Sequence, residues 1–417
     1  LLLAITALMG KAVLPASVPS TGHMATDIFE YVRFLLVDRG GGLGMLIMVL
    51  CGFAGYMSHI GANTILVKLA SKPLGVIKSP YILLVAAYLV ACAMSLAVSS
   101  ATGLGVLLMA TLFPLMVNMG ISRGAAAAVC ASPAAIILSP TSGDVVMAAQ
   151  AANMELIEFA FKLTLPISLV AIAAMAVTHF FWQRYLDQKA GEHNAAVAPS
   201  DLVTDAPGFY AILPFTPIIG VLLFDGKLGP KLDIVTIIVI CLVLAALLEL
   251  VRKRNGRELL DGLQVCWRNM ADAFAGVVML LVGAGVFAQG LMGLGFIANL
   301  LDLAQSFGTG GIVIMLVLVV ITTLAAFTTG SGNAPFYAFV ELIPHLATSL
   351  GVNPAYLVIP MLQASNLGRT ISPVSGVVVA CAGMGNLSPF EVVKRTSLPV
   401  AVGLLVVILA TQIMVPA

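Results

Sequence analysis

Long apolar segments, separated by short polar stretches, recur along the whole chain. They lie at residues 1–16, 43–58, 81–117, 120–151, 159–182, 208–224, 234–252, 277–293, 311–349, 354–384 and 397–415. A helix needs about 20 mostly apolar residues to cross the hydrocarbon of a membrane. The pattern therefore predicts an all-α membrane protein.

Two of these segments, 81–117 and 311–349, are too long for one crossing. Each has small and polar residues near its middle, at 99–105 in the first and 328–335 in the second. Backbone inside a membrane must satisfy its own hydrogen bonds, so irregular chain is tolerated only against protein or a wet cavity. We therefore expect two re-entrant hairpins, each returning to the membrane face from which it entered.

The two hairpin regions and the segments that follow them repeat one another in sequence. The matched positions are Pro114 with Pro344, Ser139-Pro140 with Ser372-Pro373, Ser142-Gly143 with Ser375-Gly376, and Leu165-Pro166 with Leu398-Pro399. The Ser-Pro-x-Ser-Gly motif predicts a broken helix in each repeat, at 139–144 and at 370–376. Paired, interrupted segments in a duplicated apolar chain are typical of secondary transporters whose site lies between the repeats.

The placement of basic residues predicts that the repeats have opposite orientations. Lys68, Lys72 and Lys78 precede the first hairpin and Arg123 follows it, so both of its ends are expected in the cytoplasm. The basic loop 252–268 is also predicted to be cytoplasmic, and one crossing at 277–293 separates it from the second hairpin. Residues 293–312 and 340–354 hold no Lys or Arg. The second hairpin is therefore expected to enter from the other face.

Composition excludes several classes of protein. Hydrophobic residues make up 60% of the 417 residues and charged residues 9%, against about 25% charged in a soluble domain. A soluble enzyme is excluded, and the net charge of +1 without a large basic cluster gives no support for nucleic-acid binding. His59, His179 and His345 form no spaced cluster, and the six cysteines have no metal-ligand spacing. We expect no metal centre, although sodium near the tips and breaks stays open, and no cofactor.

These features divide the chain into five parts. Scaffold helices with an interfacial helix are predicted at 1–80, the first part of a transport domain at 81–182, a solvated cytoplasmic linker at 183–207, the scaffold helices of the second repeat at 208–310, and the second part of the transport domain at 311–417. Residues 59–74 and 294–309 are amphipathic and are expected to lie along the interface. The chain opens on LLLAITALMG without Met, so we expect a preceding segment and do not interpret this start as a signal peptide.

The hairpin tips and helix breaks hold the candidate binding residues. A broken helix presents unpaired N–H groups, which favour anions, and unpaired carbonyls, which favour cations. Uncharged donors lie at the tips: Ser99, Ser100 and Thr102 in the first, Thr329, Ser331 and Asn333 in the second. Two such clusters across a pseudo-two-fold axis suit a ligand with an anionic group at each end. A lone Gly or Pro has a simpler explanation, because small residues also let membrane helices pack closely.

Arg369 is the most informative single residue. It lies inside an apolar segment just before the second break, where a guanidinium costs about 3 kcal/mol on insertion scales. Its planar donors fit a carboxylate. Direct contact with substrate, an ion pair with Asp144 at the other break, and an interfacial position of the side chain are the three interpretations. Asp144 itself fits a proton carrier, a cation ligand or a partner of Arg369. Glu341 and Glu391 lie towards segment ends and are expected to face headgroups.

Four long strings carry a resemblance to a known family: SLAVSSATGLGVLLMATLFP, RGAAAAVCASPAAIILSPTSGDVV, TTGSGNAPFYAFVE and PMLQASNLGRTISPVSGVVVA. They resemble the anaerobic four-carbon dicarboxylate carriers of the DcuC type, within the ion-transporter superfamily, over essentially the whole chain. The resemblance implies succinate efflux and exchange with fumarate or related acids across the bacterial inner membrane. It also implies a homodimeric scaffold with a mobile transport domain that moves as an elevator.

By position, the resemblance implies substrate contact for a set of hydroxyl and amide residues. They are Ser99, Ser100, Thr102, Ser139, Thr141, Ser142, Thr329, Ser331, Asn333, Ser372 and Ser375. Sodium-coupled relatives carry Ser-Asn-Thr at both tips, whereas this chain has Ser99-Ser100-Ala101-Thr102 at the first tip and Thr329-Gly330-Ser331-Gly332-Asn333 at the second. Coupling to H⁺, coupling to Na⁺ and plain exchange therefore all stay open.

The preferred hypothesis is a secondary transporter for four-carbon dicarboxylates that works by alternating access. A carrier of the same fold for a short-chain fatty acid or an amino-acid conjugate is the alternative within this class. An intramembrane hydrolase is more distant, because no His or Lys lies near the Ser-rich tips to act as a base. A channel has no need of paired hairpins with opposite orientations.

Overall fold

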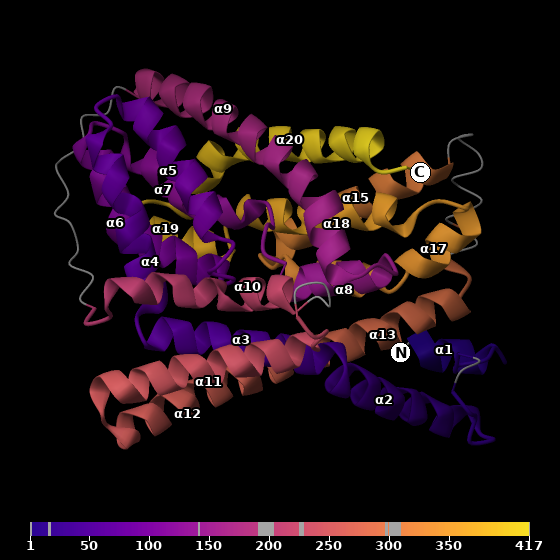
Figure 1. Ribbon diagram of the computed structural model, residues 1–417. Helices are drawn as coiled ribbons and strands as arrows, with labels where there is room; N and C mark the ends of the chain where they lie inside the picture. Colours follow the sequence, from indigo (N-terminus) through magenta and orange to yellow (C-terminus); the bar gives the residue numbers. More distant parts are fainter. Residues whose placement is uncertain are drawn as a thin grey trace.

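The structure, a computed structural model, describes residues 2–15, 18–140, 142–190, 204–224, 229–296, 299 and 310–416, and this part of the chain is helical with no strand. The first half contains α1 (Leu2–Leu8), α2 (Met24–Gly41), α3 (Leu43–His59), α4 (Ala62–Ser71), α5 (Pro80–Met94), α6 (Ala101–Asn118), α7 (Arg123–Ala131), α8 (Gly143–Ala151) and α9 (Leu165–Ala190). Figure 1 shows their arrangement.

The second half has a related order, but two short helices return its hairpin where the first half has only α6. It contains α10 (Thr216–Leu223), α11 (Ile234–Lys253), α12 (Gly256–Ala273), α13 (Met279–Gly293), α15 (Gly310–Thr329), α16 (Asn333–Val340), α17 (Ile343–Leu350), α18 (Pro354–Thr370), α19 (Gly376–Gly385) and α20 (Pro389–Met414). Short 3₁₀ turns lie at Lys72–Val76, Pro133–Ala135 and Gly208–Phe215, and π-helical turns at Glu158–Thr164 and Phe274–Val278.

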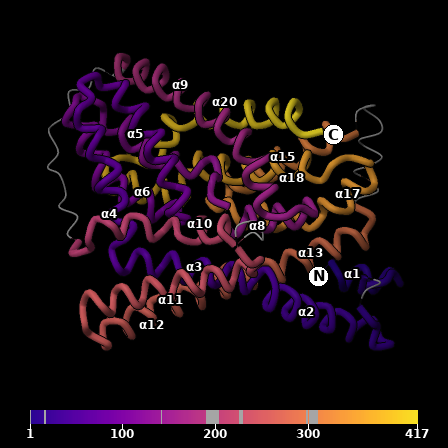
Figure 2. The backbone as a smooth tube through the Cα atoms, in the orientation of Figure 1, coloured from indigo at the N-terminus to yellow at the C-terminus, as the bar shows by residue number. Residues whose placement is uncertain are grey.

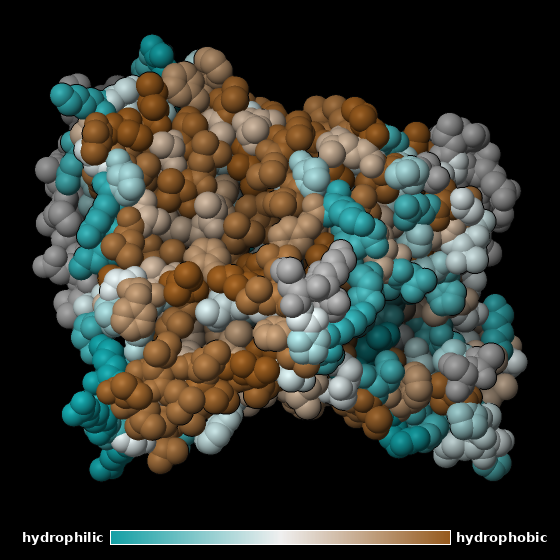
Figure 3. Space-filling model, in the orientation of Figure 1, coloured by the Kyte–Doolittle hydropathy of each residue, from teal (hydrophilic) through white to brown (hydrophobic). Residues whose placement is uncertain are grey.

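The helices have the length and composition of a multi-pass membrane protein. Within the described residues, six helices are long and apolar enough to cross a bilayer, or up to seven if α2 and α3 form one span bent by 45°. Figure 3 shows a broad hydrophobic face, with hydrophilic side chains gathered at its margins and around a hollow to the right of centre. Lipid therefore covers most of this face, as the composition predicts.

Two long interrupted helices lie in the regions predicted to be scaffold. The bend between α2 and α3 lies at a run of glycines, and α12 continues through the π-helical turn Phe274–Val278 into α13. The two interruptions touch, because a Cβ on Gly44 would lie 2.9 Å from the Val278 side chain. Figure 2 shows α2 with α3 and α12 with α13 crossing near their middles, below most of the other helices. The scaffold thus has one interrupted helix from each repeat.

Both hairpins return to where they began. In the first, the Tyr81 hydroxyl at the start of α5 and the Ser122 amide after α6 both approach Oδ2 of Asp187, at 3.1 Å and 3.4 Å. In the second, a Cβ on Gly311 at the start of α15 would lie 3.1 Å from the side chain of Val352, which follows α17. Figure 1 places α5 and α6 at one end of the molecule and α17 at the other. The hairpins therefore enter from opposite ends, as predicted.

The helix breaks lie where the Ser-Pro-x-Ser-Gly motifs predict them, with different widths. The second break is short, from Ile371 to Ser375. The first is wider, because α7 already ends at Ala131 and Pro133 opens a 3₁₀ turn before Pro140. The first tip is also displaced, since α6 begins at Ala101 and leaves 95–100 as the turn between the two arms. The second turn, 330–332, lies inside the predicted range.

The predicted linker starts later than expected. Residues 183–190 continue α9 instead of forming a solvated stretch. The reason is pairing: Gln183 is fully buried, and Asp187 forms an ion pair of 2.6 Å with Arg395 of α20. Residues 191–203, and most of the predicted interfacial stretch 294–309, lie outside the described residues. Residues 59–74 do contain a separate short helix, α4.

Candidate functional site

Both hairpin tips lie against the second helix break, residues 371–375. A Cβ on Gly330 of the second tip would lie 2.9 Å from the Val374 carbonyl oxygen. From the first tip, the Thr102 hydroxyl lies 3.2 Å from the Cβ position of Gly376, which starts α19. Gly332 of the second tip approaches the side chain of Asn366 on α18 in the same way, at 2.8 Å. The second break is therefore the point where the two repeats bring their tips together.

Buried polar atoms without partners concentrate at this break. Among the described residues, Asn366 Oδ1, Arg369 Nε, Ser372 Oγ and Ser375 Oγ are buried and form no hydrogen bond. They lie on the last turns of α18 and in the break itself. A buried polar group left unpaired costs about 1–3 kcal/mol, so native structures contain few of them. A cluster of such atoms between two polar tips indicates a place built for a polar ligand.

The two helices that begin at the breaks have N-termini without a side-chain cap. Ser142 before α8 and Ser375 before α19 occupy the capping position, but neither side chain accepts a hydrogen bond from its helix. By contrast, Ser100, Ser122 and Ser388 cap α6, α7 and α20 in the usual way. Uncapped N–H groups at a helix start carry partial positive charge and favour an anion. This feature is shared by the two breaks.

At the first break the anion is already part of the protein. Asp144, in the first turn of α8, is buried and accepts hydrogen bonds from Ser142 at 3.2 Å, from Tyr337 at 3.5 Å and from Asn366 at 3.3 Å. A carboxylate at this position interacts favourably with the helix dipole. The first break is thus internally neutralised, whereas the second has an arginine nearby instead. The two halves of the site are chemically unequal despite their matching sequences.

Arg369 is not locked in an ion pair with Asp144. Its Nη2 donates to the Ala134 carbonyl of the first break at 3.0 Å, and its Nε has no partner. Neither Arg369 nor Asp144 belongs to any ion pair found within 4 Å in the described part of the chain. The guanidinium is therefore held in place by a neutral carbonyl and keeps a donor free for a ligand.

The second repeat also satisfies the broken backbone of the first. Gln363 of α18 is fully buried; its Oε1 accepts from the Ile137 amide at 2.9 Å, and its Nε2 donates to the Ile137 carbonyl at 3.2 Å. Ser168 of α9 donates to the same carbonyl at 3.3 Å. These bonds replace those that a continuous helix would have made. The first break is fixed from both repeats at once.

The other predicted residues differ in their exposure. Ser99, Ser100, Thr102 and Thr329 are exposed at the tips, and Ser331 and Asn333 are partly buried there. Three of the hydroxyls bond locally. Ser100 Oγ accepts from the Gly103 amide at 3.1 Å, and Ser331 Oγ accepts from the Ala334 amide at 3.4 Å. Thr329 Oγ1 donates to the Ala325 carbonyl at 2.7 Å. Ser139 is buried in the first break, and Thr141 lies outside the described residues.

Sequence reasoning missed Asn366, Tyr337 and Gln363. Asn366 lies one turn before Arg369 on α18, so the polar residues at positions three apart were a signal that one face of this helix is functional. Tyr337 and Gln363 gave no such signal, because their partners belong to the other repeat. Glu341 was placed wrongly: instead of facing headgroups, it forms an ion pair of 2.8 Å with Arg39 of α2 and is 16% exposed. Glu391 pairs with Arg395 at 2.8 Å and stays 32% exposed in the first turn of α20, so its position near the headgroups stays a prediction.

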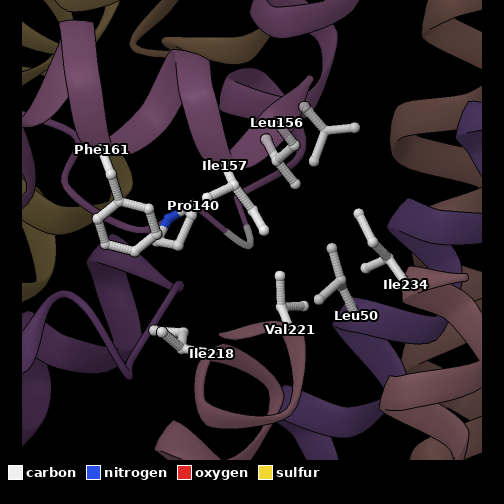
Figure 4. A pocket seen from close by; sticks show the side chains of 9 residues that line it. Leu50, Pro140, Leu156, Ile157, Phe161, Ile218, Val221 and Ile234 are labelled. Carbon is white, nitrogen blue, oxygen red and sulfur yellow. The ribbon is translucent and has the colours of Figure 1, made fainter. Parts of the chain in front are cut away.

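An apolar crevice lies where the first break approaches the scaffold. Figure 4 shows Pro140, Ile157 and Phe161 facing Leu50, Ile218 and Val221 across it. The free volume is about 10 Å³, roughly the space of a single water-sized sphere. Among the described residues no polar side chain lines it, so no hydrogen bond between these side chains crosses the crevice.

The sequence profile of one family, described as the C4-dicarboxylate anaerobic carrier family DcuC, matches residues 1–416. The chain belongs to this family. It is 70% identical over 416 residues to the anaerobic C4-dicarboxylate transporter DcuC of Escherichia coli K12, covering 100% of this chain and 90% of that protein. It is 62% identical over 419 residues to the probable DcuC transporter of Vibrio cholerae, covering 100% and 91%.

A solved structure supports the fold. The crystal structure of the YdaH transporter from Alcanivorax borkumensis, described as having an unusual topology, matches with a TM-score of 0.66 over 99% of this chain and 95% of that one, at 17% identity. Membership of the DcuC family and the apolar helices identify a multi-pass protein of the bacterial inner membrane. They also exclude the intramembrane hydrolase, since the relatives are carriers and not enzymes.

Proposed function

We propose that this protein transports four-carbon dicarboxylates such as succinate and fumarate by alternating access, and that the second break is its substrate site. One carboxylate binds at the uncapped start of α19, where Ser372, Ser375 and Arg369 supply donors. The other binds to the hydroxyls of the tips, which include Thr102 beside Gly376 and the predicted residues Ser99 and Ser100. The observation that carries this assignment is the group of four unpaired buried polar atoms at the break.

The chemistry of these groups supports an anion. Arg369 Nε and two serine hydroxyls are donors, and a carboxylate accepts from several donors at once. Asn366 Oδ1 is an acceptor and suits a hydroxyl, a water or a cation. Because Asp144 already neutralises the start of α8, the positive potential that remains lies on the side of Arg369. The related carriers from Escherichia coli and Vibrio cholerae are described as transporters of C4-dicarboxylates.

Counterflow of labelled succinate into proteoliposomes tests the proposal. We expect saturable uptake that unlabelled fumarate competes with, and that Arg369→Ala abolishes while the purified protein keeps its melting temperature. Arg33→Ala is the matched control, because Arg33 is exposed on α2 and pairs only with Glu30. Transport by Arg369→Ala at the wild-type rate would contradict the role given to this arginine.

The same vesicles test the alternative substrates and the coupling ion. Competition by short-chain fatty acids or amino-acid conjugates, without competition by fumarate, would support a carrier for another anion. Varying Na⁺ and pH independently shows whether transport is coupled to Na⁺, coupled to H⁺ or uncoupled. Asp144→Asn belongs in this series, since Asp144 is the buried carboxylate closest in structure to the site.

We also propose an elevator movement within a homodimer. The apolar crevice of Figure 4 supports the first part, because no hydrogen bond between the side chains that line it opposes a sliding movement there. The homodimer follows from the superfamily resemblance and is tested by the mass of the detergent-solubilised protein. A monomeric mass over the full range of working concentrations would contradict it.

A further inference from the structure

A buried polar chain runs along α9 from the second turn of α20 to the first break. Arg395 donates to Gln183 Oε1 at 3.3 Å, Gln183 Nε2 contacts His179 Nδ1 at 3.2 Å, and His179 Nε2 contacts Ser132 Oγ at 3.2 Å. Arg395 is 1% exposed, and Gln183, His179 and Ser132 are fully buried. The transport site described above uses none of these four side chains.

The direction of every bond in this chain is fixed. A guanidinium can only donate, so the oxygen of Gln183 faces Arg395 and its amide nitrogen faces His179. The same nitrogen donates to the Arg395 carbonyl at 2.8 Å. Nδ1 of His179 must then accept, and Nε2 carries the proton that it donates to Ser132. The Ser132 hydroxyl in turn donates to the Ala128 carbonyl at 2.8 Å. Each side chain has its orientation set by its neighbour.

One end of the chain is anchored by charge. Arg395 pairs with Asp187 at 2.6 Å and with Glu391 at 2.8 Å. Asp187 also accepts from Tyr81 and from the Ser122 amide, at the two ends of the first hairpin. Room for the guanidinium comes from Gly124, where a Cβ would lie 2.4 Å from Arg395 Nε. This anchor is rigid because both repeats contribute to it.

The other end reaches the residues that hold the site arginine. Ser132 is the first residue after α7, and Pro133 and Ala134 follow it in a 3₁₀ turn. The carbonyl of Ala134 is the one that accepts from Arg369 at 3.0 Å. The position of Ser132 therefore fixes the start of the turn that presents this carbonyl.

We infer that His179 is a positioning residue for substrate binding: through Ser132 it fixes the turn at Ala134 and so holds Arg369 towards the bound carboxylate. This inference rests on the proposed function. The competing explanation is packing alone, because the His179 ring also lies 4.9 Å from the ring of Tyr88. Packing alone predicts a change in stability without a change in the affinity for substrate.

The test compares His179→Phe, His179→Gln and Ser132→Ala in proteoliposomes, with KM and Vmax for succinate and the melting temperature of each purified variant. His179→Phe keeps an aromatic ring beside Tyr88 and removes the donor to Ser132. We expect KM to rise about five- to tenfold, the size of one lost hydrogen bond, with Vmax within about twofold. His179→Gln keeps an amide N–H for Ser132, so its KM should stay near the wild-type value.

Ser132→Ala should reproduce the rise in KM, and combining it with His179→Phe should add nothing, since both remove the same contact. Thr178→Val is the control, because Thr178 bonds only to the Ala174 carbonyl of its own helix. An unchanged KM in both His179→Phe and Ser132→Ala, with only a lower melting temperature, would overturn the inference. Arg369→Ala in the same series reports on the proposed site itself, so failure of the two ideas can be told apart.

Discussion

At the scale of single residues, the second break holds hydroxyl groups that contribute nothing to the fold. Ser375 occupies a capping position without capping, and its oxygen is buried without a partner. Ser122 occupies the equivalent position before α7 and accepts from the Ala125 amide at 3.0 Å. The two serines therefore separate a role in binding from a role in stability.

We predict that Ser375→Ala lowers the affinity for succinate at least about fivefold and leaves the melting temperature unchanged or slightly raised, because it removes an unpaired buried hydroxyl. Ser122→Ala should do the reverse, losing about 1 kcal/mol of stability while keeping its KM. Thermal unfolding and counterflow on the same preparations measure both. A loss of stability in Ser375→Ala equal to that in Ser122→Ala would show that the first hydroxyl is structural.

The sequence allowed part of this site to be predicted. Arg369 and the serines of the breaks were found because charge and Ser-Pro-x-Ser-Gly motifs are rare inside apolar segments. Gln363 and Tyr337 could not be found, since each acts on a residue of the other repeat, and no local pattern contains that pairing. The choice between substrate and Asp144 as the partner of Arg369 also depended on distances that only the fold supplies.

At the scale of elements, the second hairpin depends on a tight turn. Gly330 has φ of +70°, and a Cβ there would lie 2.9 Å from the Val374 carbonyl oxygen and 3.0 Å from the Ser375 nitrogen. Gly351 at the end of α17 has φ of +68° but open space around it. The two glycines thus share their backbone conformation and differ only in their surroundings.

Gly351→Ala should lose about 1 kcal/mol of stability, the cost of a left-handed conformation for alanine, and Gly330→Ala should lose more, because its methyl group would also press on the backbone of Val374 and Ser375. Only Gly330→Ala should also impair transport, because its methyl group pushes the tip away from the break. Melting temperatures and succinate counterflow of the two variants provide the comparison. Equal transport by both variants would mean that the tip need not touch the break.

The elements themselves were largely predictable, for a physical reason. An apolar stretch too long for one crossing, with small and polar residues at its centre, has few solutions in a membrane besides a hairpin. The end of α9 was not predictable in this way. Residues 183–190 have the composition of a solvated linker, and only the distant Arg395 explains why they stay helical. The division into five parts stays a prediction beyond this boundary.

At the scale of the whole molecule, one ion pair joins the scaffold to the second hairpin. Arg39 lies at the bend between α2 and α3, and Glu341 lies between α16 and α17, at 2.8 Å from it. Their side chains are 21% and 16% exposed. Partly buried charges are strongly destabilising when one partner is removed. The pair is therefore placed to favour the arrangement of the two parts seen here.

A double-mutant cycle of Arg39→Ala and Glu341→Ala should give a coupling energy of about 1–3 kcal/mol in thermal stability. We expect each single variant to transport more slowly than the double variant, because the single variants leave an unpaired charge between the two parts. Arg33 and Glu30, a solvent-screened pair on the same helix, should give a clearly smaller coupling energy. Additive effects at Arg39 and Glu341 would contradict a direct link.

The bond between Gln363 and Ile137 has a consequence for how the protein is made. The ribosome completes the first half of the chain long before Gln363 emerges, so the amide and carbonyl of Ile137 enter the bilayer without the partners they will finally have. Until then, water, the insertion machinery or a neighbouring segment must supply hydrogen bonds to these two groups. Neither half is a finished unit when it leaves the translocon, and correct assembly has to wait for the last third of the polypeptide.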